Sequence, residues 1–301
     1  MDTVKLKSSE MKHNLHNYQV DFVKLKLYDV DINKINWEKF TSHPNLKNHY
    51  TLNSSDEELH GKNFDMYIDK GNNVTIRMSV PYLIENHNYK AIENYDLALL
   101  LIQLKQSTGL NFPDARVLEF EFGAFERIPM STKDYLHHVN GILDYDLLKN
   151  TSYMHLYGNT KLQYKLYDAV ANAKRKKTFA RGNFPEGNLI KHELRFVVPR
   201  KTFGNDVIAF DLSRECFIKV LKEILHSQKQ SLILRQSISY KPKDTSMLHL
   251  LFTALKNIEL DYPSNVFSVV SEVIDSAKLT PSQKSKRRKT LMELETAYNA
   301  G

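Results

Sequence analysis

Three segments in the middle of the chain alternate polar and apolar residues: ARVLEFEFGAF, KLQYKLYDAV and GNLIKHELRFVVPR. In an extended strand successive side chains point to opposite faces, so each segment would have one apolar and one polar face. Such a strand packs one face against a core and leaves the other half-solvated. The pattern therefore favours a sheet that other elements cover on its apolar face.

The segments that precede this region predict more of the sheet and one helix. Residues 17–32 are rich in β-branched and aromatic residues and predict a strand. Residues 64–80 predict a hairpin that turns around residues 70–73. Residues 94–109 place leucines at the i, i+3, i+4 and i+7 spacing of an amphipathic helix, and Gly109 is a suitable stop.

Further helices follow along the chain. One is expected from about Thr132, capped by Ser131, through YLHHVNGIL. After residue 210 the patterns become helical: ECFIKVLKEIL, capped by Ser213, then TSMLHLLFTALKNIEL and NVFSVVSEVIDSAK. Thr280 and Gln283 form a capping box, with proline at the first position of a last helix.

These elements predict an α+β fold. Their order suits an antiparallel sheet with helices on one face, followed by a helical C-terminal region. We place the sheet domain at residues 1–205 and the helical domain at residues 206–301.

The amino-acid composition indicates which kind of partner the protein binds and in which cellular compartment it works. Of 301 residues, 42% are hydrophobic and 26% charged, as in soluble globular proteins, and the net charge of +7 favours polyanionic partners such as nucleic acid. The one cysteine, Cys216, excludes a disulfide framework and a cysteine zinc cluster, so we expect a reducing cytoplasm and a buried thiol. No segment has the apolar length of a signal peptide or spanning helix, so neither secretion nor membrane insertion is expected.

The polar faces of the three alternating segments carry residues that could act together. They are Glu119 and Glu121 on the first, Lys165 and Tyr167 on the second, and Lys191, Glu193 and Arg195 on the third. If the faces converge, they provide carboxylates for a divalent metal, cations for a phosphate and a phenol to attack it. Alternatively they are surface pairs of small energetic value, because any half-solvated sheet alternates in this way.

Tyr167 stands out on this face. It shares the face with Lys161 and Lys165, whereas Tyr164 sits among leucines on the other face. A phenol has a pKa of about 10, so it attacks poorly unless a cation stabilises the phenolate, and Lys165 is well placed to do so. Unlike water, a tyrosine keeps the cleaved DNA end covalently attached. Tyr167 is therefore the candidate nucleophile.

Two basic runs, residues 173–177 and 284–289, are either solvated surface or contacts to DNA phosphates. The candidate DNA contacts are Lys161, Lys174, Arg175, Lys176, Lys177, Arg181 and Lys191. Phe179 and Phe184 could stack on unpaired bases or belong to the core. His155 is open to two interpretations, a metal ligand or a packed residue, and the sequence contains no His-x-His pair.

The order of RVLEFEFGAF, YGNTKLQYKLYDAVANAKRKK and NLIKHELRFVVPRKTFG, within residues 75–205, resembles the phage and plasmid replication initiators related to the filamentous-phage gene II product. Such initiators are rolling-circle endonucleases. They nick one strand at an origin, stay joined to its 5′ end through a tyrosine and leave a 3′ hydroxyl for the polymerase. The resemblance implies a palm-like antiparallel sheet related to the HUH endonucleases, and Mg²⁺ or Mn²⁺ as cofactor.

Carried over by position, the resemblance makes Tyr167 the nucleophile, Glu121 the acidic residue of the first motif, and Glu193 with Arg195 the glutamate and arginine of the last. Two departures matter. Ala169 stands where the group usually has lysine, so Lys165 would have to supply that cation. The His-x-His metal motif of the wider superfamily is missing, which leaves metal binding to a set whose order is open: Glu119, Glu121, Glu193, Asp168 and His155.

Together these patterns predict a replication initiator of a single-stranded-DNA phage or plasmid. It would act on single-stranded or supercoiled origin DNA, with the host replication machinery, in the cytoplasm of a bacterial host. Two alternatives stay open. One is a non-enzymatic DNA-binding accessory whose carboxylates are surface charges. The other is a metal-dependent nuclease that uses water, with Glu121 and Glu193 as ligands.

Overall fold

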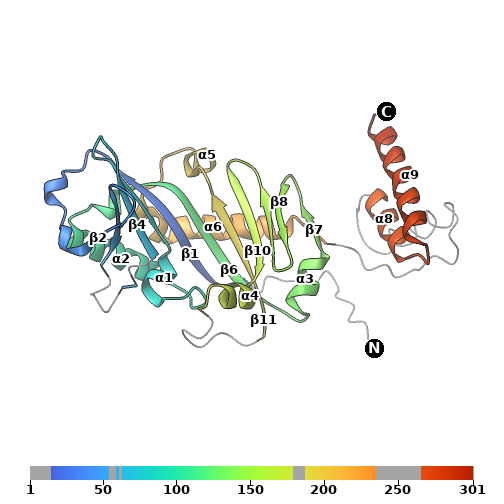
Figure 1. Ribbon diagram of the computed structural model, residues 1–301, viewed down its shortest axis with the longest axis horizontal. Helices are drawn as coiled ribbons and strands as arrows, with labels where there is room; N and C mark the ends of the chain where they lie inside the picture. Colours follow the sequence, from blue (N-terminus) through green and yellow to red (C-terminus); the bar gives the residue numbers. More distant parts are fainter. Residues whose placement is uncertain (1–14, 54–58, 61–62, 179–186, 235–265, 301) are drawn as a thin grey trace. The chain divides into compact units, whose positions relative to one another are not determined.

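The computed structural model describes residues 15–53, 59–60, 63–178, 187–234 and 266–300. The chain forms two compact units, Met1–Leu234 and Arg235–Gly301 (Figure 1). The first unit extends well past residue 205, where the sequence placed the end of the sheet domain, because the helix α6 (Glu215–Gln230) packs against the sheet.

A large antiparallel sheet organises the first unit, and the predicted α+β class is confirmed. Within the described residues ten strands follow the order β2-β3-β4-β5-β1-β6-β11-β10-β9-β8, and β7 pairs with β12 separately. The strands are β1 (Leu15–Leu27), β2 (Phe40–Ser42), β3 (His49–Leu52), β4 (Phe64–Ile68), β5 (Val74–Met78), β6 (Arg116–Ile128), β7 (Val139–Ile142), β8 (Asp146–Thr151), β9 (Met154–Gly158), β10 (Leu162–Asp168), β11 (Asn188–Phe196) and β12 (Leu232–Leu234).

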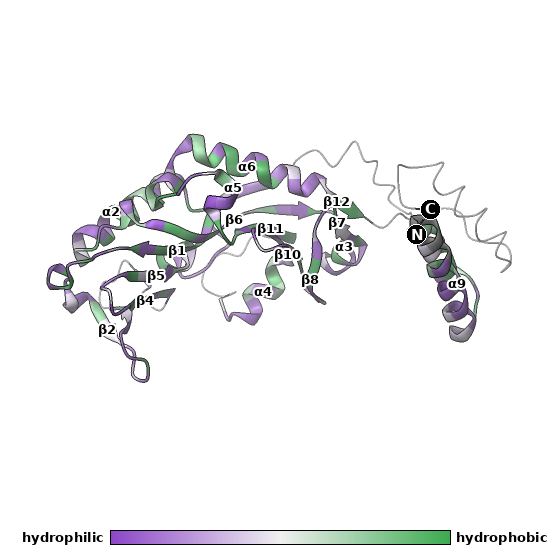
Figure 2. Cartoon of the chain, turned by 90° about the horizontal axis from the view of Figure 1, so that it is seen from above, coloured by the Kyte–Doolittle hydropathy of each residue, from purple (hydrophilic) through white to green (hydrophobic). Residues whose placement is uncertain are grey.

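Helices lie on both sides of this sheet. With α6, they are α1 (Val80–Glu85), α2 (Asn94–Thr108), α3 (Thr132–His138), α4 (Ala169–Arg175) and α5 (Pro199–Phe203). Figure 2 shows α2 and α6 along one side and α4 on the other. The side with α6 is the apolar face, because Phe217 of α6 lies 6.4 Å from Phe120 of β6, which stacks on Phe196 of β11 at 4.4 Å between ring centroids. The polar face lies on the side of α4.

The hairpin and helix predicted before the first alternating segment are confirmed. The hairpin is formed by β4 and β5. The helix is α2, which buries its stripe of leucines and ends at Gly109 with a φ of +78°. A Cβ at Gly109 would lie 2.2 Å from the backbone oxygen of Lys34, so this helix stop needs glycine for space as well as for conformation.

The next helix is shorter than its pattern predicted. Ser131 caps α3 as expected, because its hydroxyl accepts a hydrogen bond from the Asp134 amide at 3.1 Å. The helix ends at His138, however, because the following residues form β7 and pair with β12. A strand partner that is distant in the sequence therefore overrides the local helical pattern.

The start of α6 also differs from its prediction. Residues 209–213 form a separate 3-10 turn, so the N-cap of α6 is Arg214 and not Ser213. Cys216 is exposed, which corrects the expected buried thiol. The reason is its position: α6 buries Ile218 and the leucines one and two turns further on, and Cys216 lies on the opposite side of the helix.

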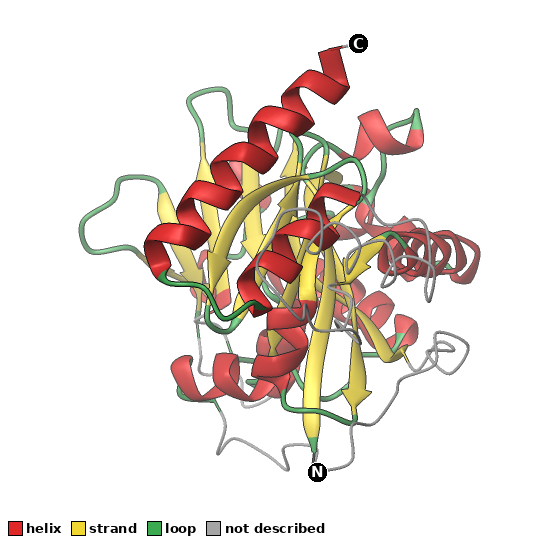
Figure 3. Cartoon of the chain, turned by 90° about the vertical axis from the view of Figure 1, so that its right-hand side faces the viewer, coloured by secondary structure: helices red, strands yellow, loops and turns green. Residues whose placement is uncertain are grey.

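The second unit contains two described helices, α8 (Val266–Ser276) and α9 (Pro281–Ala300), which Figure 3 shows joined by a short loop. The predicted capping box is confirmed. The Gln283 amide donates to Thr280 Oγ1 at 3.3 Å, and the Thr280 amide donates to Gln283 Oε1 at 2.9 Å. The helix predicted over residues 245–260 lies outside the described residues. In the described part of the chain, no helix combines the length and apolarity needed to cross a membrane.

Candidate active site

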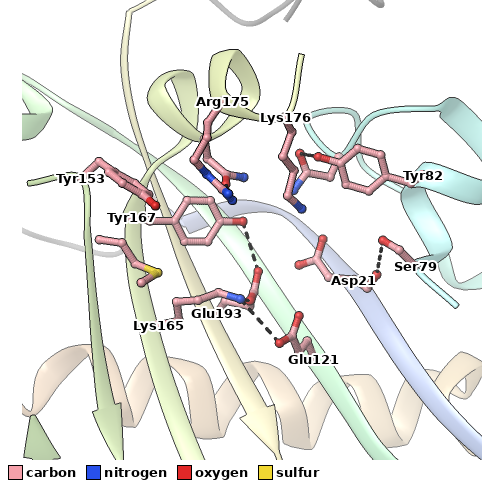
Figure 4. A pocket seen from close by; sticks show the side chains of 13 residues that line it. Asp21, Ser79, Tyr82, Glu121, Tyr153, Lys165, Tyr167, Arg175, Lys176 and Glu193 are labelled. Carbon is pink, nitrogen blue, oxygen red and sulfur yellow. Dashed lines mark hydrogen bonds and ion pairs between the residues drawn. The ribbon is translucent and has the colours of Figure 1, made fainter. Parts of the chain in front are cut away.

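The polar faces of β1, β6, β11 and β10 converge on a pocket of about 130 Å³ (Figure 4). The strand register explains the convergence: Lys165 lies opposite Glu193 between β10 and β11, and Arg195 of β11 lies opposite Glu121 of β6. Residues predicted on separate segments are therefore cross-strand neighbours. The pocket is lined by Asp21, Ser79, Tyr82, Asn88, Glu121, Tyr153, Met154, Lys165, Tyr167, Asn172, Arg175, Lys176 and Glu193.

Tyr167 projects into this pocket from the end of β10. Its hydroxyl donates a hydrogen bond to Glu193 Oε2 at 3.1 Å, and only 5% of the residue is exposed. Burial, and then the negative charges of Glu193 and Asp21, raise the pKa of the phenol well above its usual value. The hydroxyl is therefore protonated in this state, and it needs a base and a nearby positive charge before it can attack a phosphate.

Lys165 holds two of the carboxylates. Its ammonium forms an ion pair with Glu193 Oε1 and lies 3.5 Å from Glu121 Oε1. Burial alone would lower the pKa of Lys165, but the charges of Glu193 and Glu121 raise it, so the lysine stays charged. Burial and the charge of Glu193 raise the pKa of Glu121 to about 7. Burial opposes ionisation of Glu193 as well, yet Lys165 and Lys191 lower its pKa. The two carboxyl groups thus differ in protonation near neutral pH.

Asp21 on β1 is a site residue that the sequence analysis missed. It is 5% exposed, and its Oδ1 accepts hydrogen bonds from the Lys191 ammonium and, at 2.8 Å, from Gln19 Nε2. Its Oδ2 is buried and has no hydrogen-bond partner among the described residues. The signal in the sequence was a single carboxylate inside the apolar strand segment QVDFV.

Lys191 does not fit its expected role as a DNA contact. It is fully buried beneath the site, and its ammonium lies 4.9 Å from the Phe125 ring centroid.

Gly123 leaves the space that the buried ion pair of Asp21 and Lys191 occupies. A Cβ at Gly123 would meet the His192 carbonyl oxygen at 2.8 Å and Asp21 Oδ2 at 2.9 Å. Gly123→Ala is therefore expected to lower the free energy of unfolding by about 1–3 kcal/mol, through overpacking. Urea unfolding measures this loss. The matched control is Gly141→Ala, whose Cβ would only touch Ile233 at 3.7 Å, and an equal loss in both variants would contradict the steric explanation.

Arg195 and Glu119 lie on the same face but contact each other. Arg195 Nη2 and Nε lie 2.5 and 2.6 Å from Glu119 Oε1, whereas Arg195 Nε is 4.0 Å from Glu121 Oε1. Neither residue lines the pocket. The structure thus brings both near the site, with the strongest contacts of the arginine directed to Glu119.

Two residues considered as metal ligands lie away from Tyr167. Asp168 caps α4: its Oδ1 accepts from a backbone amide of the first turn at 2.9 Å, and its Oδ2 accepts from the Thr132 hydroxyl. His155 lies on the apolar face of β9, where its Nδ1 is 3.1 Å from the Tyr157 hydroxyl. Strand alternation sends both side chains away from the face that carries Tyr167. The structure therefore corrects their assignment to a shared metal site.

Tyr164 belongs to a buried network on the apolar face and does not line the pocket. Its hydroxyl bonds His192 Nδ1, His192 Nε2 lies 2.7 Å from Glu126 Oε2, and Lys229 of α6 donates to Glu126 Oε1 at 2.6 Å. His192 is fully buried and lies opposite Leu166 on the apolar face. The network ties α6 to β6, β10 and β11, so Tyr164 has a structural role.

This network predicts a stability change at acidic pH. Although burial alone would raise the pKa of Glu126, the hydrogen bond and charge of His192 and the charge of Lys229 lower it to about 2, from 4.5 in a free glutamate. A depressed folded-state pKa contributes stability above pH 4.5, and this contribution is lost as the pH falls towards 2. Glu126→Gln is expected to lower the unfolding free energy at pH 7 by about 2 kcal/mol and to flatten its acid dependence.

Urea unfolding between pH 2 and pH 7 tests this expectation for Glu126. Glu223→Gln, a change at an exposed position of α6, is the matched control and should leave the profile unchanged. An acid dependence that is equally steep in the Glu126→Gln variant would contradict the role assigned to the network.

Of the candidate DNA contacts, Arg175 and Lys176 line the pocket. Lys176 Nζ lies 4.7 Å from the centroid of the Tyr82 ring, and the Arg175 guanidinium lies 5.8 Å from that of Tyr153. Both cations thus add positive charge to the lining of the pocket. Lys161, Lys174 and Lys177 are exposed and do not line the pocket, whereas Arg181, Phe179 and Phe184 lie outside the described residues.

No protein-family model and no curated protein matches this chain. The pocket brings together three tyrosines, three carboxylates and several cations, and it is the feature of the described residues that bears on function.

Proposed function

We propose that this chain is a metal-dependent, site-specific DNA endonuclease and strand transferase that initiates rolling-circle replication with Tyr167 as its nucleophile. The observation that carries the proposal is the hydrogen bond of 3.1 Å from the Tyr167 hydroxyl to Glu193, inside a pocket that also holds Asp21 and Glu121. A tyrosine that served only for packing would not need buried carboxylates around its hydroxyl, because burying charge is costly.

The proposed reaction uses the positions of these side chains. The Tyr167 oxygen attacks a backbone phosphorus of single-stranded DNA, and its proton passes to Glu193 Oε2, which it already faces. The bond from phosphorus to the 3′ oxygen breaks, and that oxygen takes up a proton. The products are a 5′-phosphotyrosine and a free 3′ hydroxyl. Arg175 and Lys176, at the edge of the pocket, bind the phosphate oxygens.

The carboxylates of the pocket offer oxygen ligands to a divalent metal. Oxygen ligands are those that Mg²⁺ and Mn²⁺ prefer, and the buried Oδ2 of Asp21 lacks a partner among the described residues. We therefore assign Asp21, Glu121 and Glu193 to hold the ion. When bound, it supplies positive charge that stabilises the phosphate as negative charge develops on it. The substrate would be origin DNA in single-stranded or supercoiled form, and the partners the replication proteins of a bacterial host, in its cytoplasm.

Covalent capture tests the proposal. The full-length protein is incubated with Mn²⁺ and oligonucleotides tiled across the replicon that encodes it, labelled at either the 5′ or the 3′ end. Attachment through a 5′ phosphate predicts that a 3′ label stays with the protein after denaturation and that a 5′ label leaves. Peptide mapping should then place the adduct on Tyr167. Cleavage without any adduct would favour a nuclease that uses water, and DNA binding without cleavage would favour an accessory protein.

A further inference from the structure

The carboxylates of the pocket already hold a cation. Figure 4 shows the ammonium of Lys165 beside Glu193 and Glu121, with Asp21 facing the same space from the neighbouring strand. Among the described residues, no three His, Cys, Asp or Glu side chains have the arrangement of a ready metal site. The oxygens that would bind a metal are instead partly occupied by a lysine.

The two other cations of the pocket do not take this place. Lys176 lies over the Tyr82 ring, and Arg175 donates to the Asn172 side-chain oxygen at 3.1 Å. Lys191 holds Asp21 Oδ1 from beneath, which leaves the partnerless Oδ2 for another ligand. Lys165 is thus the cation that separates Glu121 from Glu193.

Lys165 also has room to leave. Its side chain is 24% exposed, whereas that of Glu193 is 3% exposed, so the lysine can swing towards solvent while the carboxylate stays fixed. A divalent ion and an ammonium cannot share the same oxygens, because like charges at contact distance repel strongly in a poorly hydrated site.

We propose that Lys165 is an internal counter-ion that occupies the metal position, and that a divalent metal binds Asp21, Glu121 and Glu193 by displacing it towards the open side of the pocket. The inference rests on the proposed function, because it concerns the same metal. Before the metal binds, the ammonium keeps buried carboxylates from repelling each other. Once displaced, it lies on the side from which the substrate phosphate enters.

Metal affinity measured on a lysine variant tests the competition without any DNA. Lys165→Met removes the ammonium at nearly constant side-chain volume, and we expect it to tighten Mn²⁺ binding at least about tenfold in calorimetry. The matched control is Lys176→Met, which removes the same charge from the same pocket but leaves the Lys165 ion pairs in place. We expect it to change the affinity much less. Equal gains in both variants, or weaker binding after Lys165→Met, would overturn the proposal.

A second measurement uses the unaltered protein, in case Lys165→Met fails to fold. Acetylation of lysines with an amine-reactive ester, read by mass spectrometry, reports which ammonium groups are accessible. We expect the labelling of Lys165 to rise several-fold when Mn²⁺ is added, while the fully buried Lys191 stays protected with and without the metal. Unchanged or slower labelling of Lys165 in saturating Mn²⁺ would show that the lysine keeps its place and would overturn the proposal.

These outcomes separate the counter-ion role from the nicking activity. If Mn²⁺ binds and Lys165 stays protected while the DNA adduct still forms on Tyr167, the displacement is wrong and the proposed function stands. If Lys165 is released by Mn²⁺ but no adduct forms on any oligonucleotide, the displacement stands and the proposed function fails. An adduct that forms equally well in a chelator would overturn the metal dependence of the proposed function, whereas the displacement of Lys165 is decided by the binding and labelling measurements.

Discussion

Replacing Tyr167 with phenylalanine is expected to reduce formation of the covalent DNA adduct by at least about a thousandfold, because the change removes the attacking oxygen and keeps the ring. The variant should still fold. It loses one hydrogen bond to Glu193, which corresponds to about 1 kcal/mol of the free energy of unfolding. Adduct formation is measured as a slower-migrating band in a denaturing gel, with Mn²⁺ and origin-bearing DNA.

The matched control for this variant is Tyr164→Phe, which changes the tyrosine three residues before Tyr167 on the same strand. Tyr164 is as deeply buried as Tyr167, but it bonds His192 on the apolar face and does not line the pocket. We expect this variant to lose stability and to keep adduct formation per folded molecule. An undiminished adduct in Tyr167→Phe would remove Tyr167 from the role. Loss of the adduct in Tyr164→Phe, with an undiminished adduct in Tyr167→Phe, would assign the nucleophile to Tyr164 instead.

Strand alternation predicted the fold and much of the pocket. The period of two in three segments placed Glu121, Tyr167 and Glu193 on polar faces, and the register joins those faces as cross-strand neighbours. The same rule separated Tyr167 from Tyr164, because a shift by one residue sends a side chain to the other face of the sheet.

The alternation of side chains along each strand did not show which residues of the polar face are buried by other parts of the protein. Lys191 and Lys165 both stand on the polar face of an alternating segment, yet Lys191 is fully buried and Lys165 is partly exposed. The difference comes from the site face itself, where α4 packs near β11 and Phe125 lies beside Lys191. Asp21 was missed for a related reason: its carboxylate lies in an apolar segment of a central strand, and its partners Lys191 and Gln19 become visible only in three dimensions.

Tertiary pairing also decided where elements end. The helical pattern after Ser131 continues past His138, but the partner strand β12 lies about ninety residues further along the chain and takes residues 139–142 into a strand. Asp168 shows the same limit for a site residue. It follows the nucleophile directly, and its carboxylate caps α4 instead of facing the pocket. Adjacency in sequence to Tyr167 therefore did not imply a shared function.

Replacing Lys191 with methionine is expected to lower the free energy of unfolding by about 3–5 kcal/mol, although a lysine in a strand is usually a surface residue. Its ammonium is fully buried and pairs with Asp21, so the change leaves a buried carboxylate whose described partner at Oδ1 is then only Gln19. Urea unfolding measures the loss. Lys161→Met, at an exposed position next to β10, is the matched control and should shift the stability by less than about 0.5 kcal/mol.

A double variant separates the buried ion pair from a general effect of losing a side chain. When Asp21→Asn accompanies Lys191→Met, no buried charge is left without its counter-ion, so part of the lost stability should return. The same protein should bind Mn²⁺ more weakly, because Asp21 is an assigned ligand. If Lys191 were a DNA contact instead, Lys191→Met would keep its stability and bind DNA more weakly with a shallower dependence on salt. A stable Lys191→Met variant with that salt response would place the ammonium outside the core and remove the support that fixes Asp21 beneath the nucleophile.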